Sequence, residues 1–418
     1  MILQGARQVG KTFLLKEFGR EEYTQVAYIN FEENEDIHDV FKGNIDPDRI
    51  LKYLSAHLKL VIDPAKALII FDEIQKCPRA LNSLKYFCEK KPEYHLCAAG
   101  SLLGVAINQE LSFPVGKVNF LELFPVNFLE FISALGFTQL RELVENREEL
   151  TNLPESFHHE LIEKLKQYYF VGGMPEAVMK FVEAADWERV RRVQNEILDA
   201  YLLDFAKYAE PATVVKIQKL WSQIPTQLAK ENHRFYMSGI SGSARLRDYQ
   251  EALQWLVSAG LVHKVERISR PGLPLSGYAE DTIFKLYFFD TGLLSAFFRL
   301  SSEIFLKGDE LFTHYYGALV ENFVSQELKA YLKETLYFWS SKGEAEVDFV
   351  YQDSKRGVVP VEVKAGLKTR SHSLTEYIKK YSPEFSLRTS LRPFGKRNHA
   401  EEIPLYALNI LRHNLSNP

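Results

Sequence analysis

Cysteine, long apolar runs and net charge are all scarce in this chain, and each shortage excludes a class of protein. The 418 residues include only three cysteines, Cys77, Cys88 and Cys97, whose spacing gives neither a C-x-x-C pair nor a zinc site with histidine. No apolar run reaches the ~18 residues of a membrane span, and no charged-then-apolar signal segment opens the chain. We therefore expect reduced, buried thiols, no membrane partner and a cytoplasmic location.

The net charge of −4 is close to neutral for this length, which argues against a general nucleic-acid coat protein but allows a local basic patch. Apolar residues at 46% and aromatic residues at 13% suffice for several buried cores. Length alone suggests roughly two to four domains.

The first motif is a phosphate-binding loop, G-A-R-Q-V-G-K-T, formed by Gly5, Ala6, Arg7, Gln8, Val9, Gly10, Lys11 and Thr12. Its glycines let the backbone curl with N–H groups aimed at phosphates, Lys11 brings a charge to the β- and γ-phosphates, and Thr12 places a hydroxyl on the bridging Mg²⁺. A helix starting near Lys11 points its positive dipole end at the same phosphates. The loop predicts ATP and Mg²⁺ as ligands.

A second motif, A-L-I-I-F-D-E at Ala67–Glu73, is an apolar run of strand length that ends in two acids. Asp72 can hold Mg²⁺ through water, and Glu73 can polarise the attacking water. A core strand with an acidic hairpin is the alternative. The position of Asp72, about sixty residues after the loop and hence one βαβα unit away, favours the nucleotide site.

Two further features of this region leave alternatives open. Ser101 follows the expected strand at His95–Ala99, where a polar side chain can sense the γ-phosphate, although a helix N-cap is an equal interpretation. Only Met1 to Gln4 precede Gly5, so either the first strand is short or an upstream segment is lacking.

Strand and helix signals alternate up to about residue 130, which predicts an α/β fold with a parallel sheet covered by helices. The expected strands are Gln25–Phe31, Leu68–Phe71, His95–Ala99 and Lys117–Leu121, and the expected helices are Asp48–Leu60 and Leu81–Glu89.

Helical patterns continue from Pro125 to about Tyr208, and Pro211 to about Val265 is typical of a winged helix with three helices and a hairpin. Its third helix, Ser243–Gly260, carries Arg245 and Arg247 on its first turns, where a DNA-reading helix has its contacts. A packing module is the alternative.

The last block predicts a long helix at Tyr315–Lys333 and strands at Glu346–Tyr351 and Val358–Lys364. Side chains alternate between the two faces of a strand, so counting by two along the neighbouring strands predicts that Asp348, Glu362 and Lys364 lie on the same face. Glu321 of the helix can join them. Clustered carboxylates bind Mg²⁺, and a lysine beside them orients or deprotonates water, as in metal-dependent nucleases. A half-exposed strand with alternating charges is the alternative.

The segment from Lys368 to Arg397 has eight Lys or Arg and only two Glu. This excess of basic residues is typical of a segment that binds the phosphate backbone of DNA or RNA. A basic surface that is exposed to water is an equally good interpretation.

These motifs, in this order, resemble a family of bacterial and archaeal AAA-type ATPases over nearly the whole chain. The matching segments are Gly5–Thr12, the D-E strand, Gly172-Gly-Met-Pro-Glu176, the winged helix, Lys285–Leu294, Gly317–Val324, Val347–Phe349 and Glu362–Lys364. The resemblance implies ATP binding and a C-terminal domain of unknown function with a restriction-endonuclease-like PD-(D/E)xK core. Where the family often has Gly-Arg before the last sheet strand, this chain has Gly116-Lys117, and a lysine cannot reproduce bidentate arginine geometry.

We accordingly expect four domains: an ATPase domain at 1–130, a helical connector at 131–210, a winged helix at 211–300 and a nuclease-like domain at 301–418. The first hypothesis is an ATPase whose nucleotide state controls a nuclease-like domain that binds DNA or RNA. The second is a nucleotide-dependent switch with an inactive nuclease-like interaction domain. A homo-oligomer is compatible with either.

Overall fold

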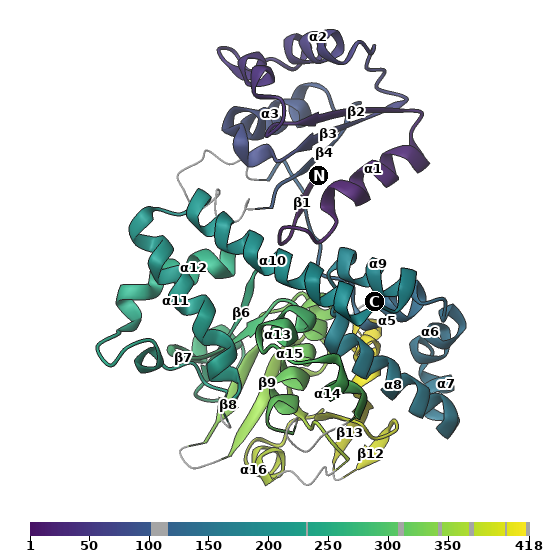
Figure 1. Ribbon diagram of the computed structural model, residues 1–418, viewed down its shortest axis with the longest axis vertical. Helices are drawn as coiled ribbons and strands as arrows, with labels where there is room; N and C mark the ends of the chain where they lie inside the picture. Colours follow the sequence, from purple (N-terminus) through teal and green to yellow (C-terminus); the bar gives the residue numbers. More distant parts are fainter. Residues whose placement is uncertain are drawn as a thin grey trace. The chain divides into compact units, whose positions relative to one another are not determined.

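The structure is a computed structural model that describes residues 1–101, 116–230, 233–307, 313–341, 345–367, 372–397 and 399–414 (Figure 1). Its residue contacts divide the chain into two units. The first comprises Met1–Phe124 with Ser258–Gly260, and the second comprises Pro125–Val257 with Leu261–Pro418. Among the described helices, none is long and apolar enough to cross a membrane.

The first unit is a parallel five-stranded sheet in the order β2-β3-β4-β1-β5, so the predicted α/β fold is confirmed. Its strands are β1 Ile2–Gln4, β2 Gln25–Asn30, β3 Ala67–Asp72, β4 His95–Ala99 and β5 Phe120–Glu122. Its helices are α1 Lys11–Glu22, α2 Pro47–Leu58 and α3 Pro78–Lys90, with 3₁₀ turns η1 Glu35–Phe41 and η2 Ile74–Lys76.

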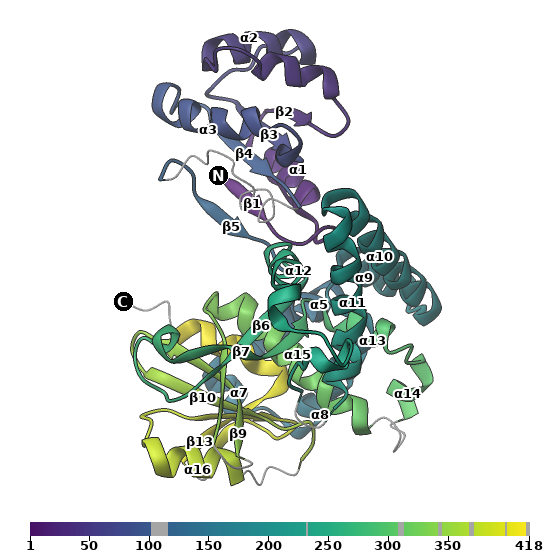
Figure 2. The same cartoon turned by 90° about the vertical axis from the view of Figure 1, so that its left-hand side faces the viewer.

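Every residue of β3 is buried because helices cover both faces of the sheet. Ile69 and Phe71 pack in the cluster that includes residues of α2 and α3, whereas Leu68 and Ile70 pack with Leu15 of α1. Figures 1 and 2 show α2 and α3 on one face of the sheet and α1 on the other. This layering places the ends of β1 and β3 beside the start of α1.

The second unit joins a helical region to a mixed sheet. Its helices are α5 Phe128–Ala134, α6 Thr138–Glu145, α7 Arg147–Thr151, α8 Glu155–Val171, α9 Pro175–Ala184, α10 Trp187–Tyr208, α11 Pro211–Leu228, α12 Leu246–Ser258, α13 Thr291–Phe297, α14 Ser302–Lys307, α15 Thr313–Leu332 and α16 His372–Tyr381, with 3₁₀ turns η3 Met237–Gly239, η4 Leu275–Tyr278 and η6 Leu405–Asn414. Its strands are β6 Val262–Ile268, β7 Ala279–Phe288, β8 Tyr337–Ser340, β9 Glu346–Asp353, β10 Gly357–Val363, β11 Leu387–Ser390, β12 Gly395–Arg397 and β13 Ala400–Pro404.

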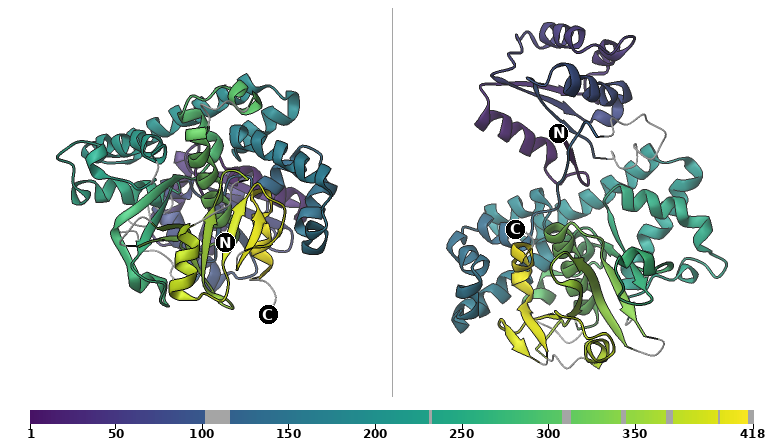
Figure 3. Two further views of the ribbon diagram at one scale, coloured as in Figure 1. Left: turned by 90° about the horizontal axis from the view of Figure 1, so that it is seen from below. Right: turned by 180° about the vertical axis from the view of Figure 1, so that it is seen from behind.

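These eight strands form one sheet in the order β12-β13-β11-β10-β9-β8-β6-β7. The strands run side by side from teal through green to yellow in Figures 2 and 3. The β6–β7 hairpin is antiparallel, and β6 pairs in parallel with β8 through Glu266–Ile268 and Tyr337–Trp339. The strand expected as the start of a wing therefore belongs to the same sheet as the strands of the expected nuclease-like domain.

The region expected to be a winged helix contains α11, the turn η3 and α12 among its described residues. In α12, Tyr249, Leu253 and Leu256 are buried, as the periodicity predicts. Arg245 precedes the helix, and Arg247 pairs with the neighbouring Asp248. The winged-helix interpretation, the four-domain division and DNA contact by these arginines stay predictions.

Candidate functional sites

The phosphate-binding loop connects β1 to α1 and has an unusual backbone. Gly5, Gln8 and Gly10 have positive φ values of 145°, 66° and 94°. A Cβ on Gly5 would lie 2.3 Å from the carbonyl oxygen of Leu123, so a side chain at this position would clash. The loop can therefore take this path only with glycine at position 5.

The ammonium of Lys11 folds back over the loop. Its Nζ donates to the carbonyl oxygens of Gly5 at 2.9 Å and Ala6 at 2.7 Å. Burial lowers the pKa of Lys11 to about 8, although the carboxylates of Glu73 and Asp72 oppose that shift. A phosphate anion beside this ammonium would supply the charge compensation that carbonyl oxygens supply only in part.

Asp72 at the end of β3 meets Thr12 at the start of α1. The Thr12 hydroxyl donates to Oδ2 of Asp72 at 2.7 Å, and the Tyr28 hydroxyl donates to the same oxygen at 2.9 Å. The backbone N–H of Glu73 donates to Oδ1 at 3.0 Å. A hydroxyl and a carboxylate oxygen at this distance are the hard oxygen ligands that Mg²⁺ prefers, so the donor set fits the ion.

Glu73 follows β3 in a left-handed conformation with φ 49°. Its carboxylate accepts hydrogen bonds from the Gln75 side chain and, at 3.3 Å, from the buried hydroxyl of Ser101. Ser101 therefore lies beside the acid-tipped strand, as expected from its position after β4. Lys117 instead pairs with Glu89 at 3.3 Å.

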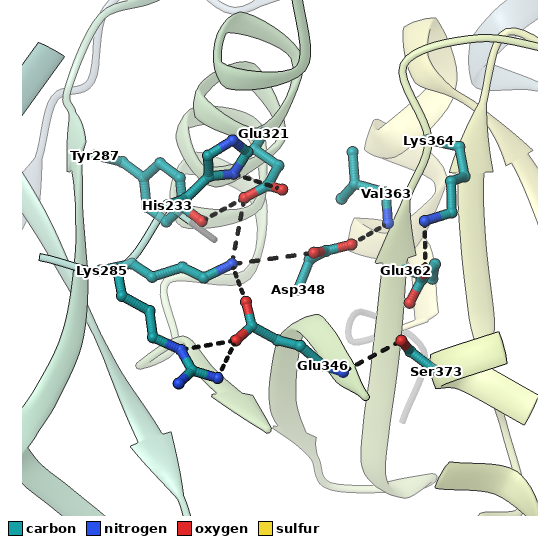
Figure 4. Close-up of polar contacts among 11 residues, drawn as sticks. His233, Lys285, Tyr287, Glu321, Glu346, Asp348, Glu362, Val363, Lys364 and Ser373 are labelled. Carbon is teal, nitrogen blue, oxygen red and sulfur yellow. Dashed lines mark hydrogen bonds and ion pairs between the residues drawn. The ribbon is translucent and has the colours of Figure 1, made fainter. Parts of the chain in front are cut away.

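The four residues of the expected nuclease-like site come from three neighbouring parts of the second unit (Figure 4). Asp348 lies on β9, Glu362 on β10, Lys364 directly after β10, and Glu321 on α15. The register places Phe349 opposite Val361, so Asp348 and Glu362 point to the same face of the sheet.

The two strand carboxylates have different partners. Oδ2 of Asp348 accepts a hydrogen bond from the backbone N–H of Val363 at 2.7 Å, whereas Oε1 of Glu362 pairs with Nζ of Lys364 at 2.5 Å. Oε2 of Glu362 is buried and has no hydrogen-bond partner among the described residues. A buried carboxylate oxygen without a partner is an available ligand for a cation.

Lys285 of β7 lies at the centre of the cluster, and sequence reasoning assigned it no role. Its Nζ is 2.8 Å from Glu346 Oε1, 3.4 Å from Glu321 Oε2 and 4.0 Å from Asp348 Oδ1. The side chain is only 1% exposed. A lysine inside the otherwise apolar run F-K-L-Y-F-F was the signal that could have identified it.

Other side chains complete the ring of charges around Lys285. His233 contacts Glu321 Oε1 at 2.8 Å, and the Tyr287 hydroxyl donates to Glu321 Oε2 at 2.8 Å. Arg234 donates to Glu346 Oε2 from Nε at 2.9 Å and from Nη2 at 2.6 Å. None of these residues belongs to the D…E-x-K pattern, and they come from segments far apart in the sequence.

The pKa shifts follow from this arrangement. Burial alone would lower the pKa of Lys285, but Glu321, Glu346 and Asp348 together raise it above its ordinary value. Burial alone would raise the pKa of Glu321, but His233 and Lys285 outweigh it and hold that pKa below its usual range. The pKa of Asp348 is raised well above its usual range by burial and by the negative charges of Glu321 and Glu362.

No group of three or more histidine, cysteine, aspartate or glutamate side chains is placed to ligate a metal within the ranges that the structure describes. Asp348 and Glu362 supply two carboxylates, and Lys285 already contributes a positive charge to their cluster. Of the basic segment from Lys368 to Arg397, residues 368–371 lie outside the described residues, and Arg388 is buried in an ion pair with Glu402. Arg388 is therefore unavailable for a phosphate backbone.

Two motifs of the resemblance meet in the second unit. The backbone N–H of Gly173 donates to Oδ2 of Asp290 at 2.6 Å, and Oδ1 of Asp290 accepts from Leu293 N–H at 2.8 Å, which caps α13. A Cβ on Gly172 would lie 2.4 Å from Asp290 Oδ1. The G-G-x-P-E and D-T-G-L-L segments are therefore packing partners.

Comparison with known proteins divides the chain into three matched segments. Residues 1–132 match the sequence model of a family described as an AAA domain. Residues 162–304 match a domain of unknown function (DUF8612), and residues 316–408 match another (DUF4143). No curated protein matches the chain.

Among solved structures, the chain is similar to the Aeropyrum pernix ORC1 protein in complex with DNA, at 13% identity and a TM-score of 0.26 over 78% of this chain and 87% of that one. It is also similar to Cdc6p from Pyrobaculum aerophilum, at 12% identity and a TM-score of 0.23 over 73% and 87% of the two chains. The Aeropyrum pernix ORC2 protein in its ADP form matches at 18% identity and a TM-score of 0.29 over 68% and 82%. TM-scores this low carry no argument about function.

Proposed function

We propose that this protein binds Mg·ATP at Gly5–Thr12 and hydrolyses it, and that nucleotide state controls its C-terminal domain. The observation that carries the proposal is the 2.7 Å hydrogen bond between Thr12 and Asp72, which unites the loop and the acid-tipped strand across 60 residues of sequence. The match of residues 1–132 to the AAA domain supports the same conclusion.

Each residue of the site has a distinct task in this proposal. Lys11 pairs with the β- and γ-phosphates, while Thr12 and Asp72 hold Mg²⁺, which neutralises phosphate charge when it is bound. Glu73 orients and deprotonates the attacking water, and Ser101, which hydrogen-bonds Glu73, senses the γ-phosphate. Lys117 has none of these tasks in the proposal, and its ammonium pairs with Glu89.

ATP binding by Lys11→Ala tests the assignment. The variant loses a charge-assisted contact to phosphate, so its affinity for Mg·ATP should fall roughly 10- to 100-fold in isothermal titration calorimetry. Lys52→Ala, at an exposed position of α2, is the matched control and should bind as the wild type does. Equal affinities of Lys11→Ala and wild type would refute the site.

For the C-terminal domain, we propose a nuclease-like site at Glu321, Asp348, Glu362 and Lys364 that binds DNA or RNA. The shared face of Asp348 and Glu362 and the unpartnered Oε2 of Glu362 support this assignment. Mg²⁺ held by the Asp348 and Glu362 carboxylates would supply Lewis-acid activation there, and Lys364 would orient water.

One observation favours the second candidate function, a nucleotide-dependent switch whose nuclease-like domain is inactive. The Lys285 ammonium already balances charge among Glu321, Glu346 and Asp348, so the cluster is stable without a divalent ion. Homo-oligomer formation and a cytoplasmic location stay predictions under either function.

A cleavage assay on labelled DNA and RNA separates these candidates. It uses the full chain with Mg²⁺ or Mn²⁺, in the presence of ATP, ADP or no nucleotide. The active-site proposal expects metal-dependent products that Asp348→Ala abolishes. Absence of products in every nucleotide state would leave the switch as the function of this domain.

A further inference from the structure

Arg191 of α10 is a half-buried cation in the second unit, and its described contacts are all with uncharged groups. Its Nη1 donates to Gln194 Oε1 at 2.8 Å, both Nη atoms lie 3.3 Å from Ser295 Oγ, and Nη2 donates to the Leu300 carbonyl oxygen at 2.9 Å. The guanidinium lies 4.1 Å from the ring centroid of Phe170. No carboxylate within the described part of the chain contacts it.

This lack of a counter-ion distinguishes Arg191 from two other arginines of the same unit. Arg234 donates twice to Glu346, and Arg388 pairs with Glu402. Burial lowers the pKa of Arg191 to about 10, and no neighbouring charge opposes the shift. An arginine is still protonated at neutral pH, so the chain half-buries a positive charge that has no counter-ion among the described residues.

The guanidinium also lies in the wall of a cavity of about 950 Å³. This volume is at the upper end of the range for small-molecule sites. Aromatic side chains from four different helices contribute to the wall, namely Phe170, Trp187, Trp221 and Phe297. Large flat apolar surfaces beside a half-buried charged group are typical of a site for an amphipathic ligand.

The other charged side chains around this cavity are exposed. They are Glu188, Asp199, Arg299 and Glu303, and water screens their charges. Arg191 is therefore the least exposed charged residue of the lining, and water screens its charge less than the charges of the other four, so it gains most from a ligand of opposite charge.

We propose that this cavity binds a small organic anion with an aromatic body, whose carboxylate or similar anionic group pairs with Arg191. The guanidinium can donate two parallel hydrogen bonds to one carboxylate. These charge-assisted bonds would replace the two 3.3 Å contacts between the Nη atoms and Ser295 Oγ. All residues that line the cavity lie between Phe170 and Glu303, within the segment that matches a domain of unknown function. The proposal is independent of the phosphate-binding loop and of the carboxylate cluster.

The test uses 8-anilinonaphthalene-1-sulfonate as an aromatic anion whose fluorescence rises in an apolar site, titrated into the full chain. Benzoate, benzyl alcohol and benzylamine then compete for the site, because they share a ring and differ in charge. Benzoate should displace the dye at concentrations roughly tenfold lower than the other two. Lys11→Ala should bind the dye like the wild type, which excludes the phosphate-binding loop as the site.

Two variants of the cavity should weaken dye binding. Arg191→Gln removes the charge and should reduce affinity roughly tenfold or more, and Ser222→Trp on α11 should fill part of the cavity and reduce it independently. Arg189→Gln is the matched control, because Arg189 lies on the same helix with a 60% exposed side chain paired to Asp186. The proposal is overturned if the wild type does not bind the dye, if both cavity variants bind it equally well at unchanged melting temperature, or if benzylamine competes as well as benzoate.

Discussion

Each of the two main sites contains a buried lysine, and burial has opposite consequences for them. Lys11 is 6% exposed, its ammonium bonds to the carbonyl oxygens of Gly5 and Ala6, and its pKa falls to about 8. Lys285 is 1% exposed, lies among three carboxylates, and its pKa rises. The chain therefore neutralises Lys285 by its own carboxylates and Lys11 only in part.

This difference indicates what each site is built to do. When the protein neutralises a buried cation only in part, binding of an external anion stabilises that cation. The arrangement of the loop therefore favours binding of a ligand. A cation enclosed by carboxylates has its counter-charges in the fold, so Lys285 holds strands and a helix of the second unit together. We therefore predict that an anion stabilises the first site and that the second site needs none.

The largest expected effect concerns catalysis at the loop. Glu73→Gln retains the shape of the side chain but cannot accept a proton, so ATP hydrolysis should slow by on the order of 10²–10⁴. Affinity for Mg·ATP should be retained, because Lys11, Thr12 and Asp72 are unchanged. Steady-state phosphate release and calorimetric ATP binding measure the two quantities.

Glu89→Gln is the matched control for this substitution. Glu89 pairs with Lys117, and neither residue contacts the loop in the proposal, so turnover should equal that of the wild type. Equal turnover of Glu73→Gln and wild type would remove Glu73 from the role of general base.

The comparison of the two lysines predicts opposite effects on stability. Lys285→Met leaves Glu321, Glu346 and Asp348 without their ammonium, so the free energy of unfolding of the second unit should fall by about 3–5 kcal/mol. Lys11→Met removes a charge whose burial costs free energy at pH 7, so the stability of the ligand-free first unit should be unchanged or higher. Urea unfolding of the full chain, followed by circular dichroism, measures both effects.

Either of two results would break the comparison. A Lys285→Met variant as stable as the wild type would show that the cluster does not need its internal cation. A Lys11→Met variant with a large loss of stability would show that the bonds to Gly5 and Ala6 support the fold rather than a ligand.

The phosphate-binding loop could be predicted from the sequence because its residues follow one another in the chain. Gly5, Gly10, Lys11 and Thr12 are fixed within eight residues, and Asp72 ends an apolar run that predicts its own strand. Period-2 counting likewise predicted that Asp348 and Glu362 share a face, because a strand's side chains alternate regardless of its surroundings.

The surroundings of those residues could not be predicted in the same way. Lys285 reaches the cluster only because β6 pairs with β8, which brings the β6–β7 hairpin into the C-terminal sheet. Arg388 is counted with a basic segment by composition, yet its strand buries it against Glu402. Strand order and long-range pairing decide both cases, and neither leaves a local pattern in the sequence.

Helix α15 contains a second comparison, because two of its buried glutamates differ in whether a cation is near. Glu321 has His233 and Lys285 beside it, which hold its pKa below the usual range. Glu327 accepts a hydrogen bond from the Phe128 N–H at 3.1 Å, and burial raises its pKa to about 8. Glu327 is therefore protonated in the folded protein at neutral pH, whereas Glu321 is ionised.

The last predicted effect is a change of stability with pH, and it follows from Glu327. Its pKa in the folded protein, about 8, exceeds the ordinary value of 4.5, so folding takes up a proton between these pH values and becomes less favourable as pH rises. Glu327→Gln does not titrate, and its amide oxygen can still accept the hydrogen bond from the Phe128 N–H. The difference in stability between the variant and the wild type should therefore grow in favour of the variant by up to about 1.4 kcal/mol for each pH unit between 4.5 and 8. Above pH 8 this difference should stay constant. Glu321→Gln should do the reverse: it should be less stable than the wild type above pH 4.5, with the gap closing as pH falls below that value. Urea unfolding at pH 3.5, 5, 6.5 and 8 tests both variants, and parallel pH profiles for Glu327→Gln and wild type would show that Glu327 is ionised in the folded protein.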